Sequence, residues 1–401
     1  FVWEKLPIRY PLYRRSPKRN LLMKILIGSN VHWWNAEAAY AAAIALLLKQ
    51  AGHSVFVLTQ PDSLNSKHLS ERGLRLLTHI NLNSKNPFKL LVSYRKLKKF
   101  LLEEQIDLIN PHRSEGFPLF VFAARSLSTN RIENHIPVIR TRGTTRPLLQ
   151  HWLNLKMHID WTSNYITAGK IVAERLLDAV PISPERLKTI YYPVECSNLP
   201  MKPPADYRTE FEIPQKAKIL AVVGRIRPVK GQRILLKSLS QLLTEFPDLV
   251  LLIPYRDTAG DEPEMQALQN DIRRFKLEAH VRLITMREDI RQLMGFADVG
   301  VVSSVESEVI CRVAVEFFSV ATPVVAFPTG CLPEIIRHGE NGYLAETQTS
   351  ESLTEELRKI LANPELCEQL GQGARRDAET RFNPQIMLTE TLKVFEQALN
   401  H

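Results

Sequence analysis

Short apolar runs alternate with longer segments of helical spacing along the first half of the chain. The runs have the length of buried strands, and the longer segments repeat apolar residues at the spacing of a helix face. This alternation predicts a parallel sheet covered by helices on both faces. We expect strands at residues 23–28, 55–59, 106–110 and 137–141, and helices at 36–50, 87–105, 116–125 and 170–179.

The second half restarts the same alternation after a proline-rich stretch. Five prolines fall within residues 193–215, which carry few periodic apolar positions and suit an interdomain linker. Beyond it we expect strands at 218–223, 249–253, 281–284, 299–303 and 323–327. Helices are expected at 231–246, 265–275, 290–296, 309–320, 352–362, 364–382 and 386–399.

The two halves predict an α/β protein of two Rossmann-like, doubly wound domains that face each other across a cleft. Ligands of open α/β sheets bind at the carboxyl ends of the strands, so we expect the site in that cleft. The expected parts are a basic peripheral extension at 1–22, an N-terminal domain at 23–195, a linker at 196–215, a C-terminal domain at 216–382, and a closing helix at 383–401 that packs back towards the N-terminal domain.

Composition narrows the class of protein. With 401 residues, 44% of them hydrophobic and 24% charged, the chain suits an ordinary globular protein of two domains. No apolar run reaches the ~18–20 residues that cross a bilayer, and residues 1–22 lack the apolar core of a secretory signal. The four cysteines show no CxxC spacing, which argues against zinc or a disulfide framework. We therefore expect a cytoplasmic protein.

The net charge of +9 suits an anionic partner, or only a basic surface. The chain has no helix-turn-helix, zinc-finger or RNA-binding signature, so we do not expect it to bind nucleic acid. The predicted helix at 87–105 is basic and suits docking to anionic lipids on the inner face of the cytoplasmic membrane. The alternative to membrane docking is that these cations only form a solvated helix face. The cations of this helix are Lys89, Arg95, Lys96, Lys98 and Lys99.

The segment 299–316 combines a strand, a loop and a helix in an order typical of phosphate binding. If the helix begins near residue 309, its unpaired N–H groups carry the positive end of the helix dipole. Glu308 then lies at the mouth of the helix and Glu316 about 12 Å further along the axis, a span comparable to a sugar diphosphate plus ribose. A carboxylate among apolar neighbours needs a partner. For Glu316 that partner is either a ligand or Arg312.

A second segment, at 224–231, follows the predicted strand at 218–223. It places Arg225 and Lys230 on either side of a turn at Pro228. Two cations at a strand end can neutralise the diphosphate that leaves during glycosyl transfer. Taken alone, such a loop is more often a solvated basic surface.

Together these motifs resemble the retaining glycosyltransferases of family 4, which have the GT-B fold. The pattern G-R-x-x-x-x-K-G at 224–231 is followed by two glutamates eight residues apart at 308–316. The resemblance continues through P-V-V-A at 323–326, G-C-L-P-E-I-I at 330–336 and G-E-N-G at 339–342. It extends over essentially the whole of residues 23–399 and is densest in the C-terminal half.

The resemblance implies a nucleotide-diphosphate-sugar donor. Arg225 and Lys230 would bind the diphosphate, Glu316 the ribose hydroxyls and Glu308 the donor sugar. Met286 would face the base. The loop that would meet the phosphate and sugar oxygens comprises Val309, Ile310, Cys311 and Arg312.

A histidine after the strand at 106–110 matches the family's N-domain histidine beside the donor sugar. Lone histidines are more often structural or exposed, but the position of His112 favours a role in the site. The catalytic set that the resemblance implies is His112, Glu308, Arg225 and Lys230.

The chain departs from the family in two loops. Residues 309–312 replace a Gly-Phe-Gly segment, and a Trp-Trp-Asn sequence replaces a Gly-Gly pair. Asn35 can cap the helix at 36–50, and Trp34 either packs on substrate or fills the cleft. Arg142, at the end of the strand at 137–141, either binds an anionic acceptor or serves the structure.

The implied reaction is sugar transfer with retention at the anomeric carbon, without a metal, because no acidic DxD motif is present. We expect a glycan or glycolipid acceptor, such as a bacterial lipopolysaccharide or another envelope glycan. Two alternatives stay open at this point: a nucleotide-sugar epimerase of the same fold and a non-catalytic nucleotide-sugar binder. The sequence does not determine the oligomeric state.

Overall fold

The computed structural model describes residues 22–82, 84, 86–128, 136–196, 206–256, 260–306 and 308–400. These form two compact units. The N-terminal unit runs to Tyr191 and takes up the chain again from Pro384, and the C-terminal unit spans Tyr192–Asn383. The expected basic extension at 1–22 lies outside the described residues, apart from Leu22.

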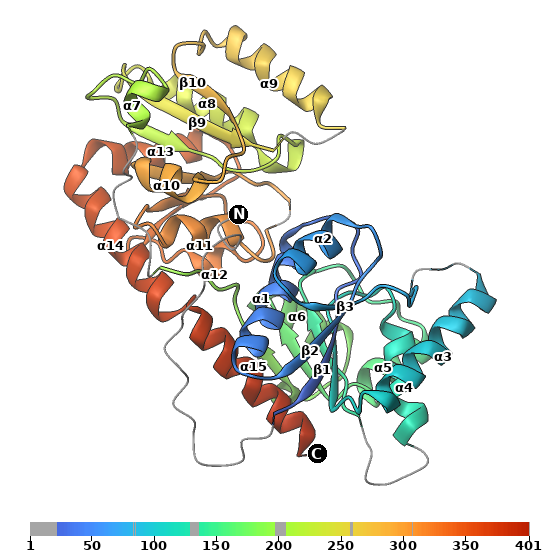
Figure 1. Cartoon of the computed structure of the whole chain (residues 1–401). Coiled ribbons are helices and arrows are strands. Elements are labelled where there is room, and N and C mark those ends of the chain that lie inside the picture. The colour runs from blue at the N-terminus through green and yellow to red at the C-terminus, as the bar shows by residue number, and fades with distance from the viewer. Residues whose placement is uncertain are drawn as a thin grey trace. The chain divides into compact units, whose positions relative to one another are not determined.

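The N-terminal unit contains parallel strands in two sheets with the orders β3-β2-β1-β4 and β5-β6-β7 (Figure 1). A parallel bridge between Ile109 and Val138 joins β4 to the segment before β5. The strand order reverses between β1 and β4, so the loops after these two strands flank the position where ligands bind in open sheets. The strands are β1 (Lys24–Gly28), β2 (Ser54–Leu58), β3 (Arg75–Leu77), β4 (Leu108–Pro111), β5 (Ile139–Arg142), β6 (Asn164–Thr167) and β7 (Leu187–Thr189).

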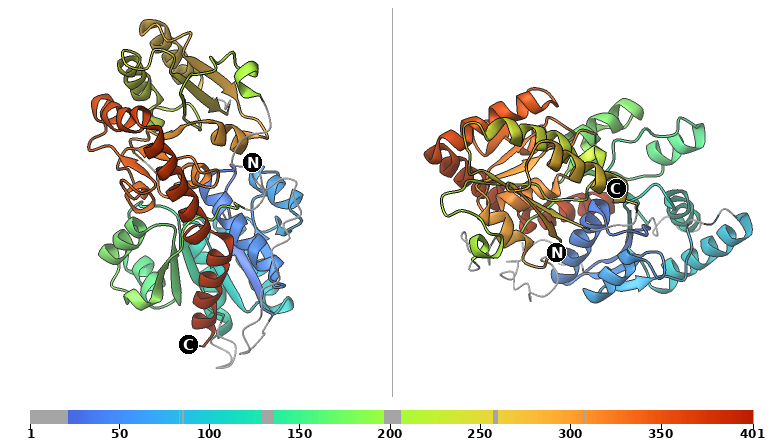
Figure 2. Two further views of the ribbon diagram at one scale, coloured as in Figure 1. Left: turned by 90° about the vertical axis from the view of Figure 1, so that its left-hand side faces the viewer. Right: turned by 90° about the horizontal axis from the view of Figure 1, so that it is seen from above.

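Helices cover these strands, and the last helix of the chain belongs to this unit. That helix, α15, packs against α1 and β6, and the left view of Figure 2 shows it, in red, running alongside the blue and green segments of this unit. The helices are α1 (Ala36–Gln50), α2 (Leu64–Glu71), α3 (Pro87–Glu103), α4 (Phe117–Ser128), α5 (Trp152–Ile159), α6 (Lys170–Ala179) and α15 (Pro384–Leu399), with a short 3-10 turn η2 (Pro184–Arg186).

The C-terminal unit is built on one parallel sheet of six strands with the order β10-β9-β8-β11-β12-β13. The order reverses between β8 and β11, as in nucleotide-binding Rossmann sheets. Loops that follow these two strands therefore flank the ligand position of this unit. The strands are β8 (Ile219–Ala221), β9 (Val250–Tyr255), β10 (Val281–Thr285), β11 (Val299–Val302), β12 (Val324–Ala326) and β13 (Gly342–Leu344).

Aliphatic side chains of this sheet form one core with helices α8 and α13, in which Leu251, Leu235 and Leu357 are fully buried. The alternation seen in the sequence arises because the central strands bury both faces under helices, whereas the edge strands β10 and β13 are partly exposed. The helices are α7 (Tyr207–Glu210), α8 (Gln232–Leu242), α9 (Glu262–Arg274), α10 (Ile290–Phe296), α11 (Arg312–Phe318), α12 (Leu332–Ile335), α13 (Ser350–Ala362) and α14 (Pro364–Thr380), with the 3-10 turn η3 (Pro228–Lys230).

Two expectations need correction. The helix expected at 309–320 begins only at Arg312, because Cys311 has a left-handed backbone with φ 51°. Residues 206–215, expected as linker, belong to the C-terminal unit. There Tyr207 of α7 is fully buried and its hydroxyl donates to Asp289 Oδ2 at 2.7 Å. The remainder of the expected linker, 197–205, lies outside the described residues.

Candidate active site

The loops after β8 and β11 are locked together at the position where the strand order reverses. Gly231 has φ 65°, and a Cβ there would lie 2.0 Å from the carbonyl oxygen of Ser303, so only glycine fits. Ser303 Oγ donates to the carbonyl of Lys230 at 2.9 Å, and the Val305 amide donates to Val229 O at 3.0 Å. These contacts place Lys230 beside the end of β11.

Lys230 forms an ion pair with Glu308 there. Ser304 Oγ donates to the same carboxylate oxygen, Glu308 Oε1, at 2.7 Å. The Lys230 and Glu308 side chains are 29% and 12% exposed, so the pair is only partly open to water. The two residues expected to hold the diphosphate and the donor sugar thus lie in direct contact.

The second expected cation, Arg225, lies in the loop after β8 and is exposed. Gln232 Nε2 donates to its carbonyl oxygen at 2.8 Å, which holds the backbone in place. Among the described residues its guanidinium has no hydrogen bond or ion pair, so all its donors are open to a ligand.

The loop from Glu308 to Cys311 is held by the segment after β12. A Cβ on Gly330 would lie 2.3 Å from the Glu308 carbonyl oxygen, and the Cys331 amide donates to that oxygen at 2.7 Å. Cys331 Sγ donates to Val309 O at 2.8 Å. Burial, followed by the contact with Cys331, raises the pKa of the Cys311 thiol well above its ordinary value, so the thiol stays protonated.

This arrangement corrects the geometry inferred for the two glutamates. Glu308 lies in a loop four residues before α11 rather than at the mouth of the helix, so the 12 Å helical spacing from Glu316 does not apply. Val309, Ile310 and Cys311 occupy the same loop, and Ile310 and Cys311 are buried. The bulkier residues of this segment therefore pack inward, and the loop presents its partly exposed Glu308 beside Lys230.

Glu316 is engaged within α11 by the residue one helical turn before it. Arg312 Nε donates to Glu316 Oε1 at 2.6 Å, so the ion pair considered from the sequence is formed. Burial lowers the pKa of Arg312, but the charges of Glu316 and Tyr192 and the hydrogen bond to Glu316 together outweigh burial, so the pKa is raised overall. The Arg312 guanidinium also lies 5.8 Å from the centre of the Tyr192 ring.

Arg291 of α10 is a further cation near Glu316, and we did not anticipate it from the sequence. It is buried and donates to Ser319 Oγ at 2.8 Å, and Ser319 Oγ donates to the Glu316 carbonyl at 2.6 Å. Burial lowers the pKa of Arg291, while the charge of Glu316 opposes that shift. The sequence did offer one signal for this residue, because Arg291 is a cation in a short helix that is otherwise mostly apolar.

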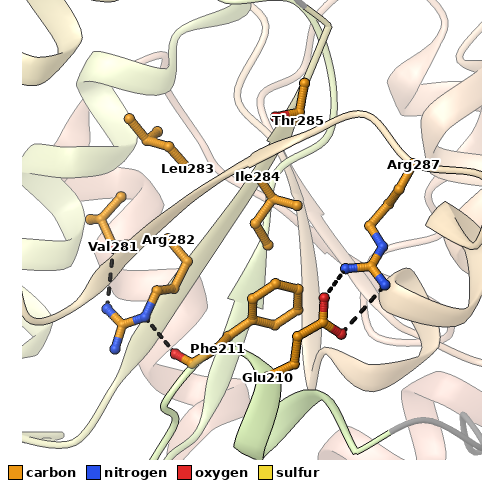
Figure 3. A pocket seen from close by; sticks show the side chains of 8 residues that line it. All are labelled: Glu210, Phe211, Val281, Arg282, Leu283, Ile284, Thr285 and Arg287. Atoms are coloured by element: carbon orange, nitrogen blue, oxygen red, sulfur yellow. Dashed lines mark hydrogen bonds and ion pairs between the residues drawn. The ribbon is translucent and has the colours of Figure 1, made fainter.

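Met286 directly follows β10, and its amide donates to Tyr255 O at 2.7 Å. A separate pocket of about 500 Å³ lies beside β10 and α7 (Figure 3), where Arg287 pairs with Glu210. None of the expected donor residues lines it. The pocket is lined by Glu210, Phe211, Val281, Arg282, Leu283, Ile284, Thr285 and Arg287.

In the N-terminal unit, His112 directly follows β4 and is buried. Asn110 Nδ2 donates to Ile139 O at 2.6 Å and to Thr141 Oγ1 at 2.9 Å, which turns Asn110 Oδ1 towards His112 Nε2 at 2.8 Å. His112 therefore carries its proton on Nε2 and has Nδ1 as an acceptor. Burial, then the charge of Arg140, lowers its pKa to about 3, so the ring is neutral.

The Trp-Trp-Asn loop follows β1 in the same unit. Asn35 Oδ1 accepts a hydrogen bond from the Ala38 amide at 2.9 Å and so caps α1, as expected. The Trp34 ring contacts residues of α2 and the turn after it: the His68 ring at 4.7 Å and the Arg72 guanidinium at 4.9 Å. Trp34 thus packs within its own unit.

Arg142, the remaining acceptor candidate, is the last residue of β5 and is buried. Its Nη2 donates to Arg146 O at 2.9 Å.

Within the described ranges, no three His, Cys, Asp or Glu side chains gather to hold a metal ion. Nor is any helix in those ranges long and apolar enough to cross a membrane.

The two Rossmann-like units are those expected of the GT-B fold, and comparison with known families agrees. The Glycosyltransferase Family 4 model matches residues 38–198, and the Glycosyl transferases group 1 model matches residues 205–377. The chain therefore belongs to the family 4 glycosyltransferases. Each model matches most of one unit.

Individual relatives are distant. Spore coat protein SA of Bacillus subtilis is 28% identical over 258 residues, which is 60% of this chain and 66%, just under two thirds, of that relative. The structure of a glycosyltransferase from Rickettsia africae superposes with a TM-score of 0.82 at 19% identity, over 94% of this chain and 99% of that one. Anabaena HepE in complex with UDP-glucose superposes with a TM-score of 0.75 at 20% identity, over 92% and 99%. These structural likenesses establish the fold.

Proposed function

We propose that this glycosyltransferase moves a sugar from a nucleotide-diphosphate-sugar donor to a glycan or glycolipid acceptor, with retention at the anomeric carbon. The observation that carries the proposal is the ion pair of Lys230 with Glu308 where the loops after β8 and β11 touch, with the open guanidinium of Arg225 in the same loop as Lys230. A cation pair at this position is suited to a diphosphate, and UDP-glucose in Anabaena HepE supports the donor class.

Donor binding then requires an exchange of partners. Lys230 leaves Glu308 to meet the diphosphate, and Glu308 turns to the hydroxyls of the donor sugar. Arg225 is already open and adds the second positive charge. The same exchange applies to Glu316. The ribose hydroxyls of the donor, which we propose that Glu316 binds, compete with the guanidinium of Arg312 for its carboxylate.

The chemical step that we propose takes place on one face of the sugar. The acceptor oxygen forms its bond to the anomeric carbon as the bond from that carbon to the diphosphate breaks. The acceptor's hydroxyl proton passes to the departing phosphate oxygen. Arg225 and Lys230 stabilise the negative charge that develops on the diphosphate, so we propose that no metal is needed. We propose that a neutral His112 accepts a hydrogen bond from a sugar hydroxyl through Nδ1 and does not act as an acid.

We propose an acceptor carried on a membrane lipid, such as a lipopolysaccharide or another bacterial envelope glycan. Helix α3 supports this proposal, because its cations lie beside apolar side chains that face water. Phe88 is 78% exposed, Leu91 45% and Val92 50%. A helix with exposed aromatic and aliphatic residues among lysines is suited to an anionic membrane surface, here the inner face of the cytoplasmic membrane.

The test begins with a thermal-shift screen across UDP-, GDP- and ADP-sugars, because a bound donor raises Tm by mass action. Turnover of the stabilising donor is then measured with and without an acceptor extract, in the wild type, Lys230→Ala and Glu316→Ala. We expect acceptor-dependent transfer that both substitutions abolish. Donor conversion without an acceptor would indicate an epimerase, and binding without any turnover would indicate a non-catalytic binder.

A further inference from the structure

Two arginines are buried at the end of β5 and have no acidic partner among the described residues. Arg140 and Arg142 are 2% and 4% exposed, and they alternate along the strand so that both side chains lie on the same face of the sheet. Arg140 Nη2 donates to Ser114 Oγ at 3.1 Å, and Arg142 Nη2 donates to Arg146 O at 2.9 Å. Nε and Nη1 of both side chains are buried and have no partner among the described residues.

The surrounding charges do not compensate these two cations. The nearby carboxylates of Glu37 and Glu115 both form ion pairs with Arg113. Burial, then the charge of Arg142, lowers the pKa of Arg140 to about 9. Burial likewise lowers the pKa of Arg142. Buried charges in proteins are normally paired, because an unpaired buried charge is strongly destabilising.

The contrast with Arg186 in the same unit argues against a purely structural role. Arg186 Nε donates to Ser163 O and Nη1 donates to Ile159 O, each at 2.9 Å, and its Nη2 donates to Thr162 O. That arginine satisfies all three nitrogens with backbone oxygens. Arg140 stacks on the Phe117 ring at 4.0 Å, but an uncharged side chain could fill that space.

We propose that Arg140, Arg142 and the Ser114 hydroxyl form a binding site for one anionic group, a phosphate ester or a carboxylate. The assignment of that group to the acceptor rests on the proposed function. The site lies at the carboxyl end of β5, beside the end of β4, where parallel sheets bind ligands. Guanidinium groups present planar pairs of donors that match the oxygens of both kinds of anion.

The probes are inorganic phosphate, glycerol 1-phosphate and D-glucuronate, each added at constant ionic strength while Tm is followed. Concentrations tenfold above Kd should raise Tm by about 3 °C. Whichever of glycerol 1-phosphate and D-glucuronate binds more tightly identifies the chemistry of the acceptor group. The protein is the full chain, without donor.

The variants separate this site from the donor site. Arg142→Met should weaken binding of the anion by about 30-fold or more and leave the shift caused by the nucleoside diphosphate intact. Lys230→Ala should do the reverse. Arg175→Met, an exposed arginine of α6, removes the same charge from the same unit and should change neither shift. Arg142→Lys keeps the charge without the paired donors, and should weaken binding by about fivefold or more even if the methionine variant does not fold.

The proposal is overturned if no probe shifts the wild type, if Lys230→Ala removes the phosphate shift, or if Arg142→Lys binds as tightly as the wild type. Failure of the proposed function has a different signature. In that case no nucleotide sugar would stabilise the chain, while the anion shift and its dependence on Arg142 would persist.

Discussion

Replacing Glu308 by glutamine should strengthen binding of the free nucleoside diphosphate and at the same time slow sugar transfer. Glutamine keeps the shape of the side chain and its hydrogen bond from Ser304 Oγ. It removes the negative charge that holds Lys230 in the unliganded protein. Lys230 is then available to the diphosphate without first leaving a carboxylate.

The magnitude follows from the burial of the pair. Two unit charges in contact at a partly buried site attract by about 4 kcal/mol at an effective dielectric constant of 20. Hydration that each ion regains on separation offsets much of this, because Lys230 is 29% exposed. A net value of about 1–2 kcal/mol corresponds to about 5- to 30-fold tighter binding of the diphosphate. Loss of the proposed contact to the donor sugar should slow transfer by about 100-fold or more.

Isothermal titration with the nucleoside diphosphate selected by the thermal-shift screen measures the first effect, and transfer kinetics measure the second. Glu306→Gln is the matched control, since this exposed glutamate lies two residues away and loses the same charge. It should change neither quantity. If Glu308→Gln weakened diphosphate binding as Lys230→Ala does, the exchange of partners would be refuted.

Three further expectations follow from the contacts. Arg312→Met should lower stability by about 1–3 kcal/mol, because it leaves the Glu316 carboxylate only 14% exposed without its partner; denaturant unfolding should show that adding Glu316→Gln restores most of the loss, and additive losses would contradict the ion pair. His112 and His158 each have a pKa lowered to about 3, by burial first and then by buried arginines. The unfolded chain therefore takes up protons first, and stability that is complete above about pH 6.5 should fall as the pH drops towards 3, by up to about 1.4 kcal/mol per pH unit for each ring; an unchanged acid unfolding profile in His158→Phe would contradict this. Replacing Lys89, Arg95 and Lys96 together by glutamine should reduce sedimentation with anionic liposomes and transfer to a lipid-bound acceptor, and unchanged kinetics with that acceptor would refute the membrane role of α3.

The sequence predicts well those elements that bury a face against their own sheet, because such burial fixes the spacing of their apolar residues. The helix at Ala36–Gln50 and the strand at Val281–Thr285 start where the pattern changes, because each buries a face of matching period. The pattern did not predict β3 (Arg75–Leu77), β13 (Gly342–Leu344) or α2. These elements are short and carry few apolar residues. Contacts with neighbouring elements therefore decide their structure, and the spacing of their apolar residues does not.

The residue types of the candidate site were also readable from the sequence, since a glycine-flanked cation pair and two glutamates after strands suit a diphosphate sugar. Their partners were not. Nothing local predicts that Lys230 contacts Glu308, which is 78 residues away along the chain. That contact exists because β8 and β11 are neighbours in the sheet and Gly231 lets their loops touch.

The sequence by itself determined the parallel α/β class and the order of the two units, since hydrophobic period and turn residues act locally. Tertiary structure alone decided where α11 begins, because contacts from Gly330 and Cys331 hold residues 308–311 out of the helix. It also decided which charges stay unpaired. Arg186 directly precedes a short strand and Arg142 ends one, yet backbone oxygens accept from all three nitrogens of Arg186 and from only one of Arg142. Burial and partners at a distance are properties of the folded chain, and they separate a structural cation from a candidate binding site.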